Sequence, residues 1–298
     1  MPNILKVNMP GDYCRHVGIP SYHPLVAVVD FKAISPMPSS LNSLGVYGLF
    51  MHSRIREDVT YGSRPLEGGD GSLVCVAPGQ LYGREDVGDL IDLDGWGLIF
   101  HPNLLVGNQL EREIRNFTFF DYSANEALML IDNERELLTS IVNNIQYELQ
   151  HGTDDKNRDS IIIGYLSVML HHCNRFYNRQ FIAMLNSGND MLVQFNNLLN
   201  DYFDSGRQLV NGIPGVQYFA DKMNMSSNYF SDLIKKLSGE SPGNIIRNHI
   251  IRLAKNMLIA KGNVSQVAYD LGFDYPQHFT RMFKKHTGMT PKQFHIGE

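Results

Sequence analysis

The fold of this chain is decided by the stretch VSQVAYDLGFDYPQHFTRMFKKHTGMTP (264–291), which repeats an earlier stretch, VQYFADKMNMSSNYFSDLIKKLSGESP (216–242). The two stretches align when one inserted residue is allowed in the later copy, and identical residues then follow in the same order in both. The matched pairs are Val216 and Val264, Ala220 and Ala268, Phe230 and Phe279, Lys235-Lys236 and Lys284-Lys285, Gly239 and Gly288, and Pro242 and Pro291. The repeat indicates two copies of one supersecondary unit.

Each copy has the pattern of a helix, a tight turn and a second helix. In the later copy, apolar residues recur at helical spacing over 264–271, and Gly272 follows where a left-handed residue ends a helix. The earlier copy has Asn224 there, a residue that tolerates positive φ. Ser226 and Asp274 are the expected N-caps of the second helices. This is the helix-turn-helix pattern.

One longer helix is expected between the copies. Ser241-Pro242 supplies an N-cap and a first-turn proline, apolar residues recur from position 245 to 258, and Gly262 ends the helix. Thr290-Pro291 then begins a last short helix, which Phe294 should anchor. The C-terminal part is therefore predicted to be all-α.

The C-terminal segment resembles the DNA-binding domain of the AraC/XylS family of bacterial transcription regulators. The resemblance covers about residues 210–298 and rests on A-x-x-x-G-F from Ala268 and F-x-R-x-F-K-K-x-x-G-x-T-P from Phe279. It implies two helix-turn-helix motifs that bind double-stranded DNA, with RNA polymerase as a further partner. Activation is the mode that the family implies, although the residues themselves leave activation or repression open.

The second helix of each motif should read bases in the major groove through its exposed side chains. In the later copy these are Gln277, His278 and Arg281; Gln suits adenine and Arg suits guanine. The alternative is that they are plain solvent-facing residues, and His278 could instead lie against a phosphate or water.

In the earlier copy the candidate base-reading residues are Asn228, Ser231 and Asp232. Asp232 departs from family members that have arginine there, because an aspartate is repelled by phosphates, although it can accept from cytosine. This departure puts base reading by the first motif in doubt.

Two lysine pairs occupy equivalent places after the reading helices. Lys235, Lys236, Lys284 and Lys285 could neutralise phosphates, or they could simply complement the dipole at a solvated helix end. Two reading helices on one linker should enter successive major-groove segments, about 34 Å apart.

The charge distribution agrees with a polyanionic partner for the tail. The 298 residues suggest roughly two domains, and the net charge of −5 would argue against nucleic acid if it were spread evenly. Residues 1–215 carry 15 Lys and Arg against 25 Asp and Glu, a net −10, whereas residues 216–298 carry 11 against 6, a net +5. The basic part is the part with the repeat.

The N-terminal part is expected to be a β-structure followed by helices, which makes the chain a two-domain α+β protein. Short apolar runs separated by Gly, Pro and Asp are typical of a sandwich or barrel, and the resemblance implies a cupin-like sensor over 1–125. Residues 126–190 are expected to be a helical dimerisation segment of a homodimer, and 191–215 a linker with a flexible joint at 205–215. The acidic run DVGDLIDLD (86–94) could bind a cation, but we expect it to be a solvated loop.

A small-molecule effector is expected in the apolar interior of the barrel. Alternating residues should point inward, and the candidates are Tyr47, Leu49, Trp96 and Phe100, with Val74 among their neighbours. Ordinary core packing is the alternative for each of them, and no ligand is named.

Catalysis, cofactors and bound metal are not expected. The histidines, such as His52 and His101, are isolated and lack cupin-metal spacing; the three cysteines form no CxxC. No apolar run is long enough for a membrane span, so we expect a cytoplasmic protein. Two alternatives stay open: a regulator whose barrel only pairs protomers, and a cupin enzyme fused to a DNA-binding tail.

Overall fold

The computed structural model describes residues 4–53, 60–61, 64–65, 71–83, 90–123, 126–151, 157–186, 191–261 and 263–296. The chain divides into two compact units, unit 1 (Met1–Gln180) and unit 2 (Phe181–Glu298). Unit 1 combines sheets and helices, and the described part of unit 2 is helical. This layout agrees with the predicted two-domain α+β class.

The main sheet of unit 1 has five strands in the order β12-β8-β5-β11-β2, and all neighbouring strands are antiparallel. The strands are β2 (Val26–Asp30), β5 (Tyr47–His52), β8 (Ser72–Val76), β11 (Gly95–Phe100) and β12 (Leu128–Met129). Both faces of the central strands are buried, since β5 and β8 expose almost no residue. The sheet is therefore covered on two sides.

One side is covered by a three-stranded sheet of order β1-β4-β9, made of β1 (Ile4–Val7), β4 (Leu41–Leu44) and β9 (Leu81–Gly83). Phe50 of β5 and Tyr82 of β9 stack between the sheets with their ring centroids 3.8 Å apart. The smaller ribbons pair β3 (Met37–Pro38) with β10 (Leu90–Ile91) and β6 (Thr60–Tyr61) with β7 (Arg64–Pro65). Apolar side chains pack the space between the two larger sheets, and closure into a cupin-like barrel stays a prediction.

The other side is covered by two long helices, α4 (Asp132–His151) and α5 (Arg158–Asn186). Trp96 of β11 donates its indole N–H to Thr139 Oγ1 of α4 at 3.0 Å. Cys75 of β8 interacts with Cys173 of α5, and burial together with this neighbour raises the pKa of the Cys75 thiol. Contacts of this kind fix the helices on the sheet.

Shorter helices complete unit 1. They are α1 (Pro10–Val17), α2 (Phe31–Ile34) and α3 (Gln109–Glu113), with 3₁₀ turns at Pro102–Leu105, Ile114–Asn116 and Thr118–Asp121. The predicted boundary at residue 125 is not a unit boundary, because Leu128–Met129 pairs with β8 as an edge strand of the main sheet. The helical segment up to residue 180 belongs to the same unit as the strands.

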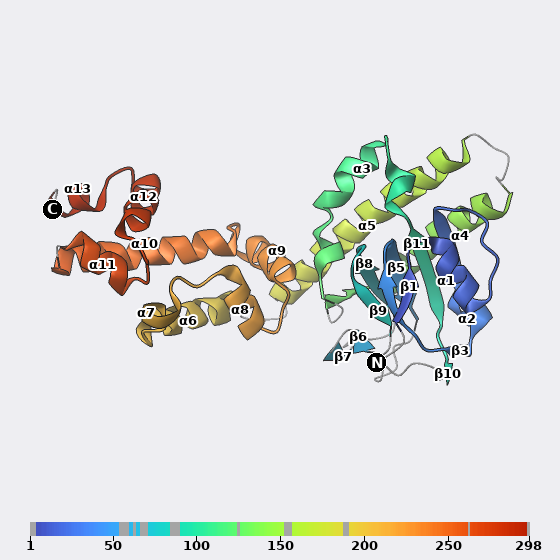
Figure 1. Ribbon diagram of the computed structural model, residues 1–298, viewed down its shortest axis with the longest axis horizontal. Coiled ribbons are helices and arrows are strands. Elements are labelled where there is room, and N and C mark those ends of the chain that lie inside the picture. Colours follow the sequence, from blue (N-terminus) through green and yellow to red (C-terminus); the bar gives the residue numbers. More distant parts are fainter. Residues whose placement is uncertain are drawn as a thin grey trace. The chain divides into compact units, whose positions relative to one another are not determined.

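Unit 2 contains two helix pairs on one connecting helix. The pairs are α8 (Val216–Lys222) with α9 (Ser227–Ser238), and α11 (Val264–Asp270) with α12 (Pro276–Thr287). Figure 1 shows α10 (Pro242–Lys261) running between them, and α13 (Pro291–Ile296) follows. The predicted helix ends are confirmed within the described residues; Gly262 lies outside them.

The two turns have the backbone that the repeat predicts. Asn224 has φ 56° and Gly272 has φ 87°, and Ser226 Oγ accepts from Tyr229 N at 3.2 Å as the N-cap of α9. The expected cap at Asp274 is wrong. The N-cap of α12 is Tyr275, which makes no side-chain cap hydrogen bond, because the helix begins one residue later than the position that Asp274 would cap.

The predicted linker over 191–215 contains α6 (Met191–Asp204) and α7 (Gln208–Asn211), which belong to unit 2. The expectation of a flexible joint at 205–215 is wrong for α7, which is a packed helix. Phe195 of α6 is fully buried, and its ring meets that of Phe230 of the first motif at 5.2 Å. Gln208 donates to the carbonyl of Asp270 in the second motif at 3.2 Å. The segment thus packs against both motifs.

Candidate nucleic-acid interface

Helix α12 has one buried apolar face and one exposed polar face. Phe279 and Phe283 are fully buried in the core of unit 2, whereas Gln277, His278 and Arg281 are exposed. The structure therefore brings the three predicted residues together on the outer side of one helix, where a DNA groove can reach them. Their role as base-reading residues stays a prediction.

Tyr275 is an exposed aromatic residue at the start of this face, and the sequence analysis missed it. Its ring is 56% exposed and meets the His278 ring edge-on, with centroids 5.5 Å apart. The usable signal was an aromatic residue directly before the first-turn proline, Pro276. Tyr275 and His278 together form an aromatic start to the reading helix.

Helix α9 differs from α12 in how much of its polar face is free. Asn228 is exposed, but Ser231 and Asp232 are half-buried, so the expectation of full exposure is wrong for these two. On the same helix, Tyr229 is 4% exposed and packs its ring against Phe181 at 5.1 Å. The last residues of α5 therefore cover one side of α9.

The four predicted phosphate-binding lysines lie where the repeat places them. Lys235 and Lys236 are in the last turn of α9, and Lys284 and Lys285 are in the last turn of α12; all four are exposed. Their long side chains can reach a phosphate backbone beside each reading helix.

The structure places a further cation, Arg247, near His286 at the end of α12. Partial desolvation, together with the charges of Arg247 and Lys285, lowers the pKa of His286. Arg247 belongs to the connecting helix α10, where Asn244 accepts one of its N–H groups at 2.7 Å. The positive charge near α12 therefore comes from two helices, which no local pattern in the sequence indicates.

The connecting helix sets the distance between the two reading helices. Its 20 residues give an axial length of about 30 Å. Successive major-groove segments on one face of DNA are about 34 Å apart. The length of α10 is therefore of the size that two adjacent segments require.

Comparison with known proteins agrees with this geometry. Residues 219–295 match the family described as a helix-turn-helix domain. The C-terminal unit contains an AraC-type helix-turn-helix domain. This AraC-type domain accounts for α8–α13, and the predicted resemblance of the C-terminal segment is confirmed.

Two curated proteins are similar to this chain over part of its length. The "Uncharacterized HTH-type transcriptional regulator in cgkA 5'region" of Pseudoalteromonas carrageenovora is 31% identical over 106 residues, 36% of this chain and 56% of that protein. The Bacillus subtilis protein "Uncharacterized HTH-type transcriptional regulator YobQ" is 39% identical over 67 residues, 22% of this chain and 28% of that protein. The chain thus spans about half or less of the length of these relatives.

A solved structure is also similar to part of the chain. It is the C-terminal domain of the two-component response regulator yesN from Fusobacterium nucleatum, with 23% identity and a TM-score of 0.30. The match covers 34% of this chain and 96% of that one.

The four predicted pocket residues lie on the helix-covered face of the main sheet. Strand pairing places Tyr47 opposite Phe100, and Leu49 and Trp96 follow at even spacing, so all four share this face. The expectation that they point into the interior between the sheets is wrong. Phe50, of the opposite parity, points there, and so does Val74, its pairing partner. Both faces are apolar because both are covered, so alternation alone could not tell them apart.

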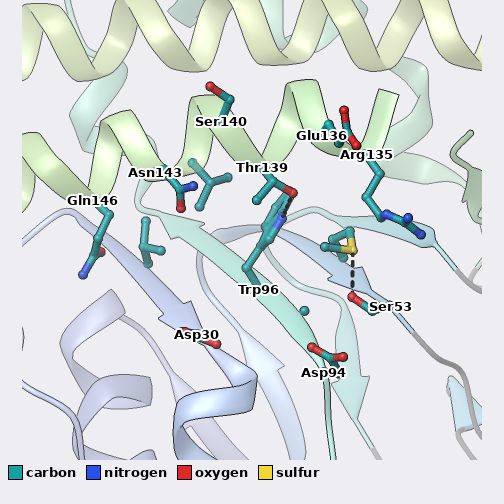
Figure 2. Close-up of a pocket in the computed structure, with 14 residues that line it drawn as sticks. Asp30, Ser53, Asp94, Trp96, Arg135, Glu136, Thr139, Ser140, Asn143 and Gln146 are labelled. Carbon is teal, nitrogen blue, oxygen red and sulfur yellow. Dashed lines mark hydrogen bonds between the residues drawn. The ribbon is translucent and has the colours of Figure 1, made fainter. Parts of the chain in front are cut away.

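A cavity of about 640 Å³ opens on the same helix-covered face, between α4 and the strands β2, β5 and β11. Of the four predicted pocket residues, Trp96 lines it. Figure 2 shows Trp96 on the sheet side and Thr139, Ser140, Asn143 and Gln146 on the helix side. Asp94, the last residue of the acidic run, also lines this cavity; residues 86–89 of that run lie outside the described residues.

The histidines are held by local structural contacts. His52 is 4% exposed, accepts or donates a hydrogen bond with the Tyr82 hydroxyl at 3.0 Å, and stacks on Phe31. Burial lowers its pKa to about 4. His101 caps a 3₁₀ turn by accepting from Asn103 N. Among the described residues, no three His, Cys, Asp or Glu side chains are grouped to hold a metal ion.

No helix in the described ranges is both long and apolar enough to cross a bilayer.

Proposed function

We propose that this protein is a sequence-specific DNA-binding regulator of transcription. The observation that carries the proposal is the repeated motif: two reading helices, α9 and α12, each end in an exposed lysine pair and are joined by α10. Two helices with lysine pairs suit successive major-groove segments of DNA, which are flanked by negatively charged phosphates. The AraC-type domain supports the same function.

The two motifs contribute unequally to base reading. Gln277, His278 and Arg281 on α12 are exposed and form the main reading surface. On α9, Asn228 is exposed, while Ser231 and Asp232 are half-buried. The first motif therefore supplies fewer base contacts and relies more on its phosphate contacts through Lys235 and Lys236.

The N-terminal unit acts as a cupin-like sensor and pairs two copies of the chain. Support for pairing comes from α5, where Ile161 and Val168 are 37% and 49% exposed; they are seven residues apart and so lie on one helical face. A small molecule bound by unit 1 would modulate DNA binding. The homodimer works in the cytoplasm, contacts RNA polymerase and acts by binding, without catalysis.

Selection of bound DNA from a random pool by the full chain tests the proposal. We expect one enriched motif, asymmetric within each protomer's site, and a footprint with two protected groove segments one helical turn apart. Absence of an enriched motif, or protection of a single segment, would contradict it.

A matched pair of variants controls the selection. Lys284→Ala removes a cation at the end of α12, whereas Lys292→Ala removes an equally exposed one from α13. Loss of binding in the first and retention in the second assigns binding to the reading helix; equal loss in both would contradict that assignment.

A further inference from the structure

The cavity beneath α4 is separate from the interior between the sheets. The interior is packed by the stack of Phe50 on Tyr82 and by the apolar residues around it. The cavity lies on the opposite face of the main sheet, where α4 leaves a volume of about 640 Å³. That volume suits a small organic molecule.

The floor of the cavity is apolar and contains an aromatic ring. Val28, Met51 and Trp96 of the sheet line it, with Val142 of α4 facing them, and Trp96 is only 5% exposed. Its indole N–H is engaged by Thr139 Oγ1, so the ring is held in place. A fixed indole ring attracts cations as well as apolar groups.

The polar lining is rich in acceptors. Three carboxylates, those of Asp30, Asp94 and Glu136, line the cavity. Asp30 lies opposite Trp96 in the strand register, with one oxygen accepting from the backbone N–H groups of Lys32 and Ala33. Figure 2 shows Asp30 and Asp94 on the sheet side and Glu136 on α4.

Arg135 and Gln146 agree with this bias towards acceptors. Arg135, a cation of the lining, is bound by Asp132 at 2.8 Å, outside the lining. The side-chain oxygen of Gln146 is buried and has no hydrogen-bond partner among the described residues. A buried acceptor without a donor costs stability unless a ligand supplies one.

We propose that this cavity binds an organic cation, a protonated amine that carries an apolar body. The apolar body lies on the floor around Trp96, and the ammonium group donates to the carboxylates of Asp30 and Asp94. The binding step depends on unit 1 alone; its regulatory consequence rests on the proposed function.

Trp96 is the only tryptophan of the chain, so its fluorescence reports occupation of the site directly. We would titrate the full chain with 2-phenylethylamine, the neutral 2-phenylethanol and the anionic phenylacetate. The amine should saturate the signal and bind at least about tenfold more tightly than the alcohol, because charge-assisted hydrogen bonds are roughly twice as strong as neutral ones. No saturable change with the amine, or equal binding of all three, overturns the proposal.

Three variants locate the binding. Asp94→Asn and Asp30→Asn should each weaken the amine about threefold to tenfold and leave the alcohol unchanged; asparagine keeps the N-cap that Asp30 supplies to α2. Asp92→Asn, an exposed neighbour outside the lining, is the control with the same change in charge. Circular dichroism checks that all three fold. Unchanged amine binding in both lining variants overturns the assignment.

A second measurement separates this inference from the proposed function. DNA affinity is measured with the selected sequence, with and without saturating amine. Amine binding without a change in DNA affinity keeps the site and contradicts modulation through it. Loss of sequence-specific DNA binding in every condition contradicts the proposed function and leaves the fluorescence result standing.

Discussion

The turn of the second motif is a place where a single added methyl group should destabilise the DNA-binding unit. Gly272 has φ 87°, and a Cβ built there would lie 2.7 Å from the carbonyl oxygen of Gln208 and 3.1 Å from the carbonyl carbon of Gly212. Both are backbone atoms, so neither can swing aside. Gly272→Ala therefore combines a left-handed backbone with a steric overlap.

Gly239→Ala is the matched control for this substitution. Gly239 ends α9 with φ 78°, but a Cβ there meets no atom of the described residues within 4 Å. Its cost is the left-handed backbone alone, about 1–2 kcal/mol. Overpacking adds about 1–3 kcal/mol at Gly272, so Gly272→Ala should cost about 2–5 kcal/mol.

Urea unfolding is followed by circular dichroism, which reports the helices of both units, and by Trp96 fluorescence, which reports unit 1 alone. The free energy of unfolding of unit 2 comes from the part of the circular dichroism change that does not follow the fluorescence. We expect Gly272→Ala to lose clearly more stability than Gly239→Ala. Equal losses would refute the packing of α7 on the second turn. A second readout is the footprint, in which the segment protected by α12 should weaken first.

The other predictions concern DNA reading and acid stability. Arg281→Ala should cost about 1–3 kcal/mol and relax preference at one base position, while Lys284→Ala should weaken all sequences alike and lower the salt slope by about 1; unchanged discrimination in Arg281→Ala would exclude base reading. Burial holds the pKa of His52 at about 4, so this histidine costs no stability above about pH 6.5, and the free energy of unfolding falls by about 3 kcal/mol as pH drops from about 6.5 to 4. His52→Gln should abolish that loss in urea titrations at neutral and acid pH, and an unaltered acid loss would assign it to other groups.

Most of unit 2 could be predicted from the sequence because its signals are local. Asn224 and Gly272 mark the turns, Ser226 caps α9, and glycines end both reading helices; each choice depends on a few neighbouring residues. The lysine pairs were found from the repeat alone. Exposure of Gln277 and Arg281 followed from helical spacing.

The remainder depends on contacts between distant segments. Residues 205–215 look like a joint because they are rich in Gly and polar residues, and only the partners of α6 and α7 show that this region is packed. The half-burial of Asp232 is not given by helical spacing alone. Alternation in β5 and β11 predicted strands correctly but could not assign their faces.

The connecting helix α10 makes the spacing of the two recognised DNA segments independent of which bases are recognised. Inserting one residue into it would turn the second motif by about 100° and advance it by only about 1.5 Å, so the later reading helix would face away from the groove. Small insertions or deletions in α10 therefore abolish two-site binding and do not adjust the spacing between the two recognised DNA segments. The bases recognised can change through single substitutions at exposed positions such as Gln277 or Asn228, while the distance between the two recognised elements stays constant.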